Sequence, residues 1–436
     1  MSRSCAALMV SAPASGSGKT SVSAAIARAH ARRGLKVRVF KTGPDYLDPM
    51  VLARASGHAV YQLDLFMGGL AHCRQLLAEA AEEADLILVE GVMGLFDGKP
   101  SSADLAAAFG LPVLAVLDAS AMAQTFAALA LGLQGFRSDI RLCGVVANRV
   151  GSAAHGAMVA EGLPPTLPLV AAIARQQDLT LPERHLGLVQ ALELPGLDAQ
   201  LDAWADAWEA GLVGGFEFPR VEFAGRSAEP LPPLLAGRRI ALAQDACFSF
   251  IYPANLDCLR ALGAELRPFS PLAGEALPDC DALWLPGGYP ELHAAALRAQ
   301  PGFFASLAQH LTLGKPLLAE CGGMLCLLDE LCDAEGRAQP MAGLLPGRAQ
   351  MQTRLAALGL QTLDWPEGTL RGHSFHYSTL DTPLLPLARA SNPNGGRTAE
   401  ALYAQGSLRA SYVHHYFPSN PEALARFFIS AGHHAD

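Results

Sequence analysis

A glycine-rich segment at residues 12–20, with the sequence APASGSGKT, constrains the fold of this chain more than any other feature. It follows an apolar run at 6–10 and precedes a stretch of helix-forming residues that ends at Gly34. Strand, glycine-rich turn and helix in this order are typical of phosphate-binding loops, because backbone N–H groups and the positive end of the helix face the anion. The expected fold class is therefore α/β with a parallel sheet.

Four residues of this loop are predicted to bind a nucleotide and its metal ion. Gly16 and Gly18 let the backbone approach phosphate, Lys19 would reach the β and γ phosphates, and the Thr20 hydroxyl would hold Mg2+. The strict phosphate-loop pattern has glycine where this chain has Pro13. A flexible Gly/Ser turn before a helix is the alternative, and the flanking strand and helix favour the phosphate loop.

Two aspartates follow a second predicted strand at residues 35–40. The segment 41–49 (KTGPDYLDP) places Asp45 and Asp48 at the carboxyl end of this strand, where open α/β sheets bind ligands. Both carboxylates are candidates for holding Mg2+ or positioning a substrate. Aspartate beside proline is also ordinary turn chemistry, so the spacing leaves both interpretations open.

A third predicted strand, residues 85–89, ends in an acid. Its apolar run is typical of a buried parallel strand, and Glu90 stands at the carboxyl end. An acid in this place commonly accompanies a phosphate loop and holds the metal or a water. Asp97 follows in a glycine-bounded turn and is a weaker candidate of the same kind. A helix cap is the alternative for such an acid.

Further strands are expected at 112–117, 142–147 and 169–173, so that strands alternate with helical stretches in a doubly wound parallel sheet. Asn148, at the end of one of them, either reads a nucleotide base with its amide or caps the following helix. Residues 214–237 show neither helical nor strand periodicity, and we interpret them as a linker between domains at 1–213 and 238–436.

The second domain contains a candidate nucleophile. Strands are expected at 239–243 and 281–285, with a helix at 252–262. Cys321 follows a strand directly and precedes two glycines and an apolar pattern that predicts a helix through Leu331. Such a sharp strand-to-helix turn is a nucleophile elbow, in which the helix N-terminus lowers the thiol pKa and exposes the sulfur. Gly287 and Gly288 are suited to give N–H groups to an oxyanion.

A cysteine nucleophile needs a base, and His414 in the segment SYVHHYF is the candidate. Its neighbour His415 is the second possibility and His376 the third. Cys326 and Cys332 lie within the predicted helical pattern and are interpreted as inert buried thiols.

Composition narrows the function classes. The 436 residues are 51% hydrophobic and carry a net charge of −9, which describes a compact protein and argues against a nucleic-acid surface. The nine cysteines include no C-x-x-C pair, so neither a zinc site nor a disulfide framework is expected. The N-terminus shows no signal peptide, and polar residues break the most apolar region, 105–136. A cytoplasmic protein without a membrane span is the expectation.

The first half resembles the dethiobiotin-synthetase-type P-loop ligases, and the second resembles a class I glutamine amidotransferase domain. Together with the segments 12–20, 43–49, 90–98 and 181–188, this fusion resembles the cobyrinic acid a,c-diamide synthase family, over nearly the whole chain. In that family proline at position 13 is normal.

The resemblance implies two coupled reactions. ATP with Mg2+ phosphorylates the a and c side-chain carboxylates of a corrin ring, and ammonia released from glutamine by Cys321 converts the acyl phosphates to amides. It also implies roles for six polar residues and two ring contacts: Lys19, Thr20, Asp45, Asp48, Glu90 and Asp97 toward ATP, metal and substrate carboxylate, and Tyr46 and Leu47 toward the ring. The implied partners are glutamine, ATP and the corrinoid, with a homodimer possible.

Some features depart from the wider pattern or stay open. Amidotransferases usually have glutamate two residues after the catalytic histidine, and here that residue is Tyr416. Arg149, Arg184 and His185 are candidates for contacts to the ring carboxylates. The rival functions are a sister ligase (cobyric acid synthase or nickel-sirohydrochlorin a,c-diamide synthase) and, more distantly, a P-loop partitioning ATPase, whose early loop lysine this chain lacks.

Overall fold

The computed structural model describes residues 2–175, 183–184, 187–225, 230–396 and 399–430. The chain divides into two compact units, Met1–Ala228 and Glu229–Asp436. Among the described residues, no helix is both long and apolar enough to cross a membrane. The division between the units falls within the predicted linker.

The first unit is built on an eight-stranded sheet in the order β3-β2-β4-β1-β5-β6-β7, with β10 paired to β1. All these pairings are parallel except that of β10 with β1, which is antiparallel. The strands are β1 (Ser2–Ser11), β2 (Val37–Thr42), β3 (Tyr61–Leu63), β4 (Leu86–Glu90), β5 (Val113–Asp118), β6 (Leu142–Val150), β7 (Leu169–Ala174) and β10 (Arg220–Ala224); β8 (Glu183–Arg184) and β9 (Gly187–Leu188) form a separate hairpin.

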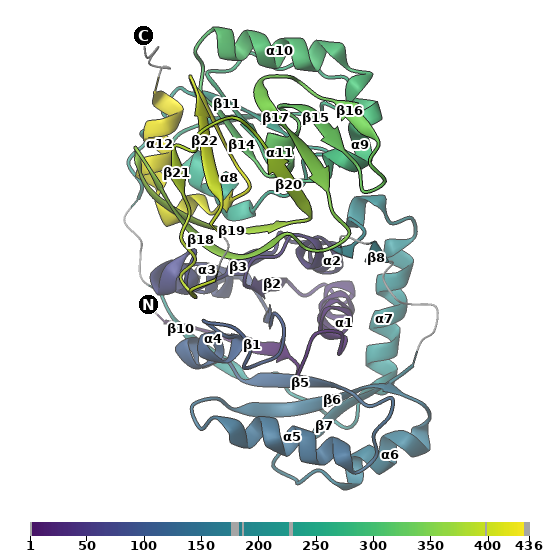
Figure 1. Ribbon diagram of the computed structural model, residues 1–436. Coiled ribbons are helices and arrows are strands. Elements are labelled where there is room, and N and C mark those ends of the chain that lie inside the picture. Colours follow the sequence, from purple (N-terminus) through teal and green to yellow (C-terminus); the bar gives the residue numbers. More distant parts are fainter. Residues whose placement is uncertain (1, 176–182, 185–186, 226–229, 397–398, 431–436) are drawn as a thin grey trace. The chain divides into compact units, whose positions relative to one another are not determined.

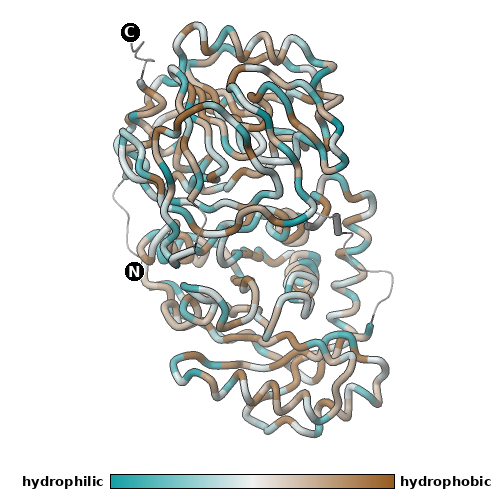
Figure 2. Tube along the Cα trace, in the orientation of Figure 1, coloured by the Kyte–Doolittle hydropathy of each residue, from teal (hydrophilic) through white to brown (hydrophobic). Residues whose placement is uncertain are grey.

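Helices cover both faces of this sheet (Figure 1). On β1, Ala7 and Met9 point into one apolar core and Leu8 and Val10 into the other, as the two-residue period of a strand requires. In Figure 2 apolar colour accordingly runs along the central strands. The helices that cover the first core are α3 (Gly69–Glu83), α4 (Ser102–Phe109), α5 (Thr125–Phe136) and α6 (Ala153–Glu161). Those that cover the second core are α1 (Lys19–Arg32), α2 (Leu47–Ser56) and α7 (Leu197–Gly211). A short 3-10 turn, η1 (Ala191–Glu193), precedes α7.

The second unit has a seven-stranded sheet in the order β12-β11-β13-β14-β23-β22-β21. It is parallel from β12 to β23, and the two edge strands β22 and β21 pair antiparallel. Its strands are β11 (Arg239–Ala243), β12 (Glu265–Phe269), β13 (Ala282–Leu285), β14 (Leu317–Glu320), β21 (Ala388–Arg389), β22 (Ala401–Gln405) and β23 (Leu408–Ser411).

Two smaller sheets and several helices complete the second unit. One sheet contains β15 (Leu328–Cys332), β16 (Ala338–Pro340), β17 (Leu345–Met351) and β20 (Ser378–Asp381), and the other contains β18 (Ala357–Trp365), β19 (Gly368–His376) and β24 (His414–His415). The helices are α8 (Pro253–Ala261), α9 (Pro290–Arg298), α10 (Pro301–Thr312), α11 (Gly322–Leu325) and α12 (Pro421–Ile429), with a 3-10 turn, η2 (Phe417–Ser419).

The doubly wound α/β fold class is confirmed, and the strands and the helix at 252–262 form where predicted. Two local expectations are wrong. The predicted linker contains β10, in which Val221 and Phe223 alternate with exposed residues and pack on the first core. The helix expected through Leu331 ends at Leu325, and β15 follows it. Residues 321–328 are all buried. Without alternating apolar and polar residues, the hydrophobic periodicity of this segment does not distinguish a helix from a strand.

Candidate active sites

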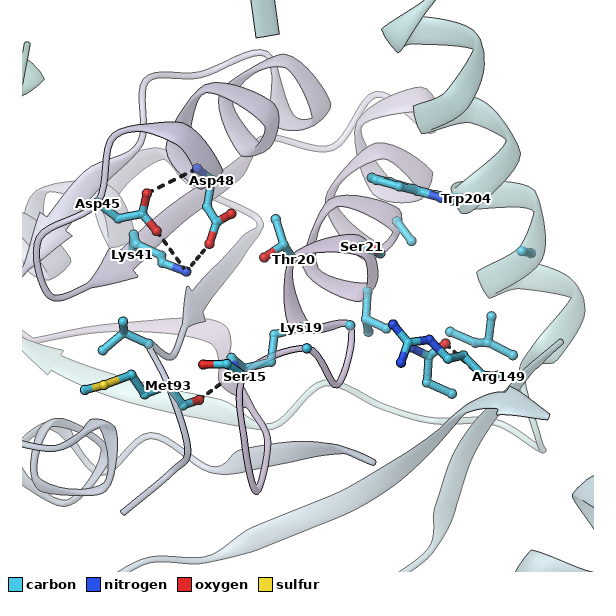
Figure 3. A pocket seen from close by; sticks show the side chains of 18 of the residues that line it. Ser15, Lys19, Thr20, Ser21, Lys41, Asp45, Asp48, Met93, Arg149 and Trp204 are labelled. Carbon is cyan, nitrogen blue, oxygen red and sulfur yellow. Dashed lines mark hydrogen bonds and ion pairs between the residues drawn. The ribbon is translucent and has the colours of Figure 1, made fainter. Parts of the chain in front are cut away.

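The phosphate loop of the first unit has the predicted geometry. Gly16 and Gly18 have φ of 79° and 94°, left-handed values that favour glycine. A Cβ on Gly18 would lie 2.2 Å from Asn148 Nδ2. Lys19 opens α1, and its Nζ donates to the carbonyl oxygens of Met93 (2.6 Å) and Ala14 (3.1 Å), as Figure 3 shows for Met93. Burial lowers the pKa of Lys19, with the Lys41 charge adding to the effect.

The predicted carboxylates gather around a lysine that sequence reasoning missed. Lys41 Nζ lies 2.6 Å from Asp48 Oδ2 and 3.5 Å from Asp45 Oδ2 (Figure 3). It also lies 2.6 Å from Glu90 Oε1. Lys41 and Glu90 are register partners on β2 and β4, and both are buried. The sequence did contain a signal for this cluster, namely a lysine at a strand end that is followed by two aspartates. A buried ammonium needs carboxylate partners of this kind.

The charges in this cluster oppose burial. Burial favours neutral Lys41, but Glu90, Asp48 and Asp45 outweigh it and hold the pKa of Lys41 well above its ordinary value. Burial raises the pKa of Asp45, and the charge of Asp48 raises it further. Burial also raises the pKa of Glu90, against the opposing charge of Lys41.

Oxygen donors for Mg2+ are present beside the loop. Thr20 Oγ1 donates to Glu90 Oε1 at 3.0 Å, and the buried Glu90 Oε2 has no hydrogen-bond partner among the described residues. The described part of the chain contains no group of three or more His, Cys, Asp or Glu side chains that could hold a metal by itself. This donor set fits Mg2+, which usually takes one or two carboxylates and completes its shell with phosphate and water.

A cavity of about 450 Å³ connects these residues with α7. It is lined by Gly16, Gly18, Lys19, Thr20, Lys41, Asp45, Asp48, Asn148, Arg149 and Trp204, among others. Asn148 Nδ2 donates to the Ser17 carbonyl at 3.0 Å and so holds the loop. The N-cap of the next helix is Ser152, so the capping alternative for Asn148 is wrong, and base recognition stays a prediction. Arg149 forms an ion pair with Asp118.

Of the remaining predicted residues of the first unit, Asp45 lines this cavity, and Tyr46, Leu47 and Asp97 have other surroundings. Asp45 Oδ1 accepts from the N–H groups of Leu47 (2.9 Å) and Asp48 (3.3 Å), so Asp45 also has the turn role left open above. Tyr46 and Leu47 start α2 and are half-buried. Asp97 is exposed and accepts from Gly94 N–H. The side chain of Arg184 and most of the segment 181–188, including His185, lie outside the described residues.

In the second unit, Cys321 occupies a nucleophile elbow. It lies between β14 and α11 with φ of 44° and ψ of −110°, strained for a residue other than glycine. The glycines after it allow the turn, because a Cβ on Gly323 would lie 2.2 Å from the Leu285 carbonyl oxygen. The prediction of an exposed thiol with a lowered pKa is wrong. Cys321 is buried, and burial, with the Glu291 charge, raises the pKa of its thiol.

His414 is the histidine beside this cysteine. A Cβ added to Gly287 would lie 2.3 Å from His414 Cε1 and 3.4 Å from Cys321 Cβ. The side chains of His414 and Cys321 therefore both border the space beside Gly287, and a larger residue at position 287 would fill that space. A Cβ on Gly322 would lie 2.9 Å from Gly288 N, which brings the second predicted oxyanion glycine to the same turn. Burial lowers the pKa of His414, and neighbouring histidines add to the effect. Burial thus disfavours the charged form of both side chains.

The other two candidate histidines have different partners. His415 Nδ1 and backbone N–H both lie 2.8 Å from Glu320 Oε1, and Trp284 Nε1 donates to Glu320 Oε2. His376 Nε2 lies 3.1 Å from Glu400 Oε1. The Tyr416 ring packs against Tyr252, 5.5 Å between centroids.

The His414 ring stacks on a further histidine that sequence reasoning missed. The centroids of His414 and His373 are 5.0 Å apart at 19° between planes. His373 Nδ1 lies 3.2 Å from the Tyr252 hydroxyl. This stack supports the His414 ring.

Family models match both units. The CobQ/CobB/MinD/ParA nucleotide binding domain matches residues 8–189, and the CobB/CobQ-like glutamine amidotransferase domain matches residues 239–422. The hydrogenobyrinate a,c-diamide synthase of Stutzerimonas stutzeri is 59% identical, over 97% of this chain and 98% of its own length. That of Pseudomonas aeruginosa is 57% identical, over 98% of each. The chain belongs to the a,c-diamide synthase family.

A further relative of this chain is named for cobyrinate instead of hydrogenobyrinate. The cobyrinate a,c-diamide synthase of Herminiimonas arsenicoxydans is 52% identical, over 97% of this chain and 96% of its own length. The family predicted from the residues is therefore confirmed, and so is a nucleotide-binding half joined to a glutamine amidotransferase half. That second half distinguishes the chain from a P-loop partitioning ATPase.

Proposed function

We propose that this chain catalyses ATP- and glutamine-dependent amidation of the a and c side-chain carboxylates of hydrogenobyrinate or cobyrinate. The observation that carries the proposal is the presence of two complementary sites on one chain. One combines a phosphate loop with a lysine-centred carboxylate cluster, and the other combines an elbow cysteine with a histidine. The nearly full-length relatives support the same activity.

In the first unit, the residues prepare a carboxylate for attack. Lys19 would leave the carbonyls of Met93 and Ala14 for the β and γ phosphates of ATP. Thr20, Asp45 and Glu90 would hold Mg2+, which neutralises charge on the transferring phosphate. The substrate carboxylate takes the γ phosphate, ADP leaves, and ammonia then displaces phosphate from the acyl phosphate. Asp48 and Asp97 are assigned to the substrate carboxylate, and Tyr46 and Leu47 to the ring.

In the second unit, Cys321 Sγ attacks the glutamine side-chain amide while its proton passes to His414. The imidazolium returns that proton to the leaving ammonia, and water hydrolyses the thioester to glutamate. A neutral imidazole is required for the first transfer, and burial keeps His414 in that form. The backbone N–H groups of Gly287 and Gly288 are assigned to the oxyanion.

The proposal also covers the ring substrate, the location of the protein and its oligomeric state. Relatives named for hydrogenobyrinate are 59% and 57% identical, against 52% for one named for cobyrinate, which supports the metal-free ring as the first substrate to test. The nine cysteines are all unpaired, which supports a reducing, cytoplasmic location. A homodimer stays a prediction that sedimentation can check.

The experiment is ATP-dependent amidation followed by mass spectrometry. Both rings are offered with glutamine or with ammonium, to the wild type and to Cys321→Ala. We expect two added amides per ring, with the variant losing use of glutamine and keeping use of ammonium. If neither ring is amidated with either nitrogen source, the corrinoid assignment fails, and nickel sirohydrochlorin becomes the next substrate to test.

A further inference from the structure

A second cavity in the amidotransferase unit, of about 440 Å³, contains charges that the chemistry above does not use. Its lining includes Arg389 and Glu400, together with His376, Ser378, Tyr403 and Tyr412. These residues come from β19, β20, β21 and the segment around β22 and β23. The cavity therefore lies at the antiparallel edge of the large sheet, where the smaller sheets adjoin it.

This cavity adjoins the reacting thiol. Tyr412 lies two residues before His414, and the carbonyl of the preceding residue, Ser411, accepts from the Cys321 N–H at 2.8 Å. The charge of Glu400 contributes to the raised pKa of Cys321. Glu400 is thus within electrostatic range of the sulfur, although neither Cys321 nor His414 lines the cavity.

Glu400 is held firmly in this cavity. His376 Nδ1 lies 2.9 Å from the Ser378 carbonyl oxygen, and His376 Nε2 lies 3.1 Å from Glu400 Oε1. Both ring nitrogens of His376 therefore lie within hydrogen-bond distance of an oxygen atom. The His376 ring stacks on Tyr412 with 3.7 Å between centroids, and the Tyr412 hydroxyl bonds Ser378 Oγ at 2.8 Å. The carboxylate is therefore fixed by a packed network.

Arg389 supplies the opposite charge. It stands on β21 with its Cα paired to Ala401, the residue after Glu400. Among the described residues, no ion pair or side-chain hydrogen bond involves its guanidinium, which is exposed. The cavity thus presents the guanidinium of Arg389 on β21 and the fixed carboxylate of Glu400, which directly precedes the neighbouring strand β22. This pattern complements a zwitterion, that is, a free amino acid.

We propose that this cavity binds the amino-acid end of glutamine, with Glu400 accepting from the α-ammonium and Arg389 pairing with the α-carboxylate. The side-chain amide then extends toward Cys321. His376 is a positioning residue that orients Glu400. This inference rests on the proposed function of the second unit, and it names the residues by which that unit recognises its nitrogen donor.

The test is steady-state kinetics of glutamate release by the full-length protein. Glu400→Gln should raise KM for glutamine about ten- to hundredfold, since a hydrogen bond between charged groups is lost, with a smaller change in kcat. Arg389→Met should raise KM similarly. Ammonium-dependent amidation should be unchanged in both. Glu265→Gln and Arg267→Met, an exposed ion pair of the same unit, are the matched controls and should behave as wild type.

Two substrate analogues separate the roles. Glutaramate lacks the α-ammonium and glutamine α-methyl ester lacks the carboxylate. Glu400→Gln should remove most of the wild-type preference for glutamine over glutaramate and leave the preference over the ester. Arg389→Met should do the reverse. For His376, the Ala variant should lose discrimination against glutaramate, and the Gln variant, which keeps a donor toward Glu400, should retain it.

Several results would contradict this inference or the function on which it rests. Unchanged KM in Glu400→Gln and Arg389→Met, or loss of ammonium-dependent amidation in the exposed Arg389→Met, overturns the inference. Glutamate release is measured without the ring, so failure of the corrinoid assignment leaves this test intact. Wild type that amidates with ammonium but never releases glutamate would instead contradict the proposed function of the second unit.

Discussion

The two sites occupy the same place in their sheets but differ in electrostatics. In the first unit, Lys41 lies among three carboxylates beside an open cavity. In the second, Cys321 and His414 are buried, and burial disfavours the charged form of each. Under the proposed function, the first site binds highly charged ligands, and the second contains a nucleophile whose charged form is disfavoured by burial. The carboxyl ends of parallel strands therefore fix where a site lies, but not its charge.

The sharpest way to separate the two sites is Lys19→Met. Removing the ammonium that we propose to bind phosphate should lower amidation about a thousandfold with either nitrogen source, because in the proposed reaction acyl phosphate formation precedes use of ammonia. Amidated product is quantified by mass spectrometry, and glutamate release should fall much less. The control is Lys36→Met, an exposed lysine. Amidation within tenfold of wild type would remove Lys19 from the site.

Lys41→Met tests whether the carboxylate cluster depends on its cation. Three carboxylates would lose a buried partner, which should lower the free energy of unfolding by about 3–5 kcal/mol. The pKa values of the remaining carboxyls should rise, so the acid limb of the pH–amidation profile should move to higher pH. Urea unfolding and pH–rate curves measure both. Arg54→Met, in an exposed pair with Asp198, should leave both unchanged.

In the second unit, substitution of His414 should affect activity, and substitution of His415 should affect stability. His414→Ala should lower glutamate release about a hundredfold and leave ammonium-dependent amidation intact. His415→Ala should keep glutamate release but reduce the free energy of unfolding by about 1–3 kcal/mol, since Glu320 loses a hydrogen-bond donor in the interior. The reverse pattern would make His415 the base.

The smallest expected effect concerns pH and stability. Burial lowers the pKa of His373 to about 3, against about 6.5 in an unfolded chain. Between these values the unfolded state binds the extra proton, so stability falls as pH falls below 6.5. One such histidine contributes about 1.4 kcal/mol per pH unit. Urea unfolding at pH 7.5, 6 and 5 should show a shallower loss for His373→Asn than for wild type, and equal slopes would contradict this account.

Much of this protein could be predicted from short segments. The phosphate loop was recognisable because Gly16, Gly18 and Lys19 specify a local backbone that needs few distant contacts. The elbow at Cys321 was recognisable for the same reason, as glycines must follow so tight a turn. Glu90 and Asp45 were found because the apolar strands before them end abruptly.

Other features depend on neighbours that are distant in sequence. Residues 321–328 are buried on every side, so only pairing with β17 shows that the chain continues as a strand after Leu325. The strand β10 is defined by its partner β1. The sequence named His414 first and left His415 open, and the structure supplies the reason to prefer His414, because its ring lies beside Gly287.

The sequence by itself therefore determined the α/β class, the two sites and the family, because glycine conformation, strand period and apolar runs are properties of adjacent residues. Only the tertiary structure decided that Lys41 joins the carboxylates, that the Cys321 thiol is buried, and that Arg389 and Glu400 share a cavity. Charge state and recognition depend on burial and on distances between residues from different strands, and packing of the whole unit sets both.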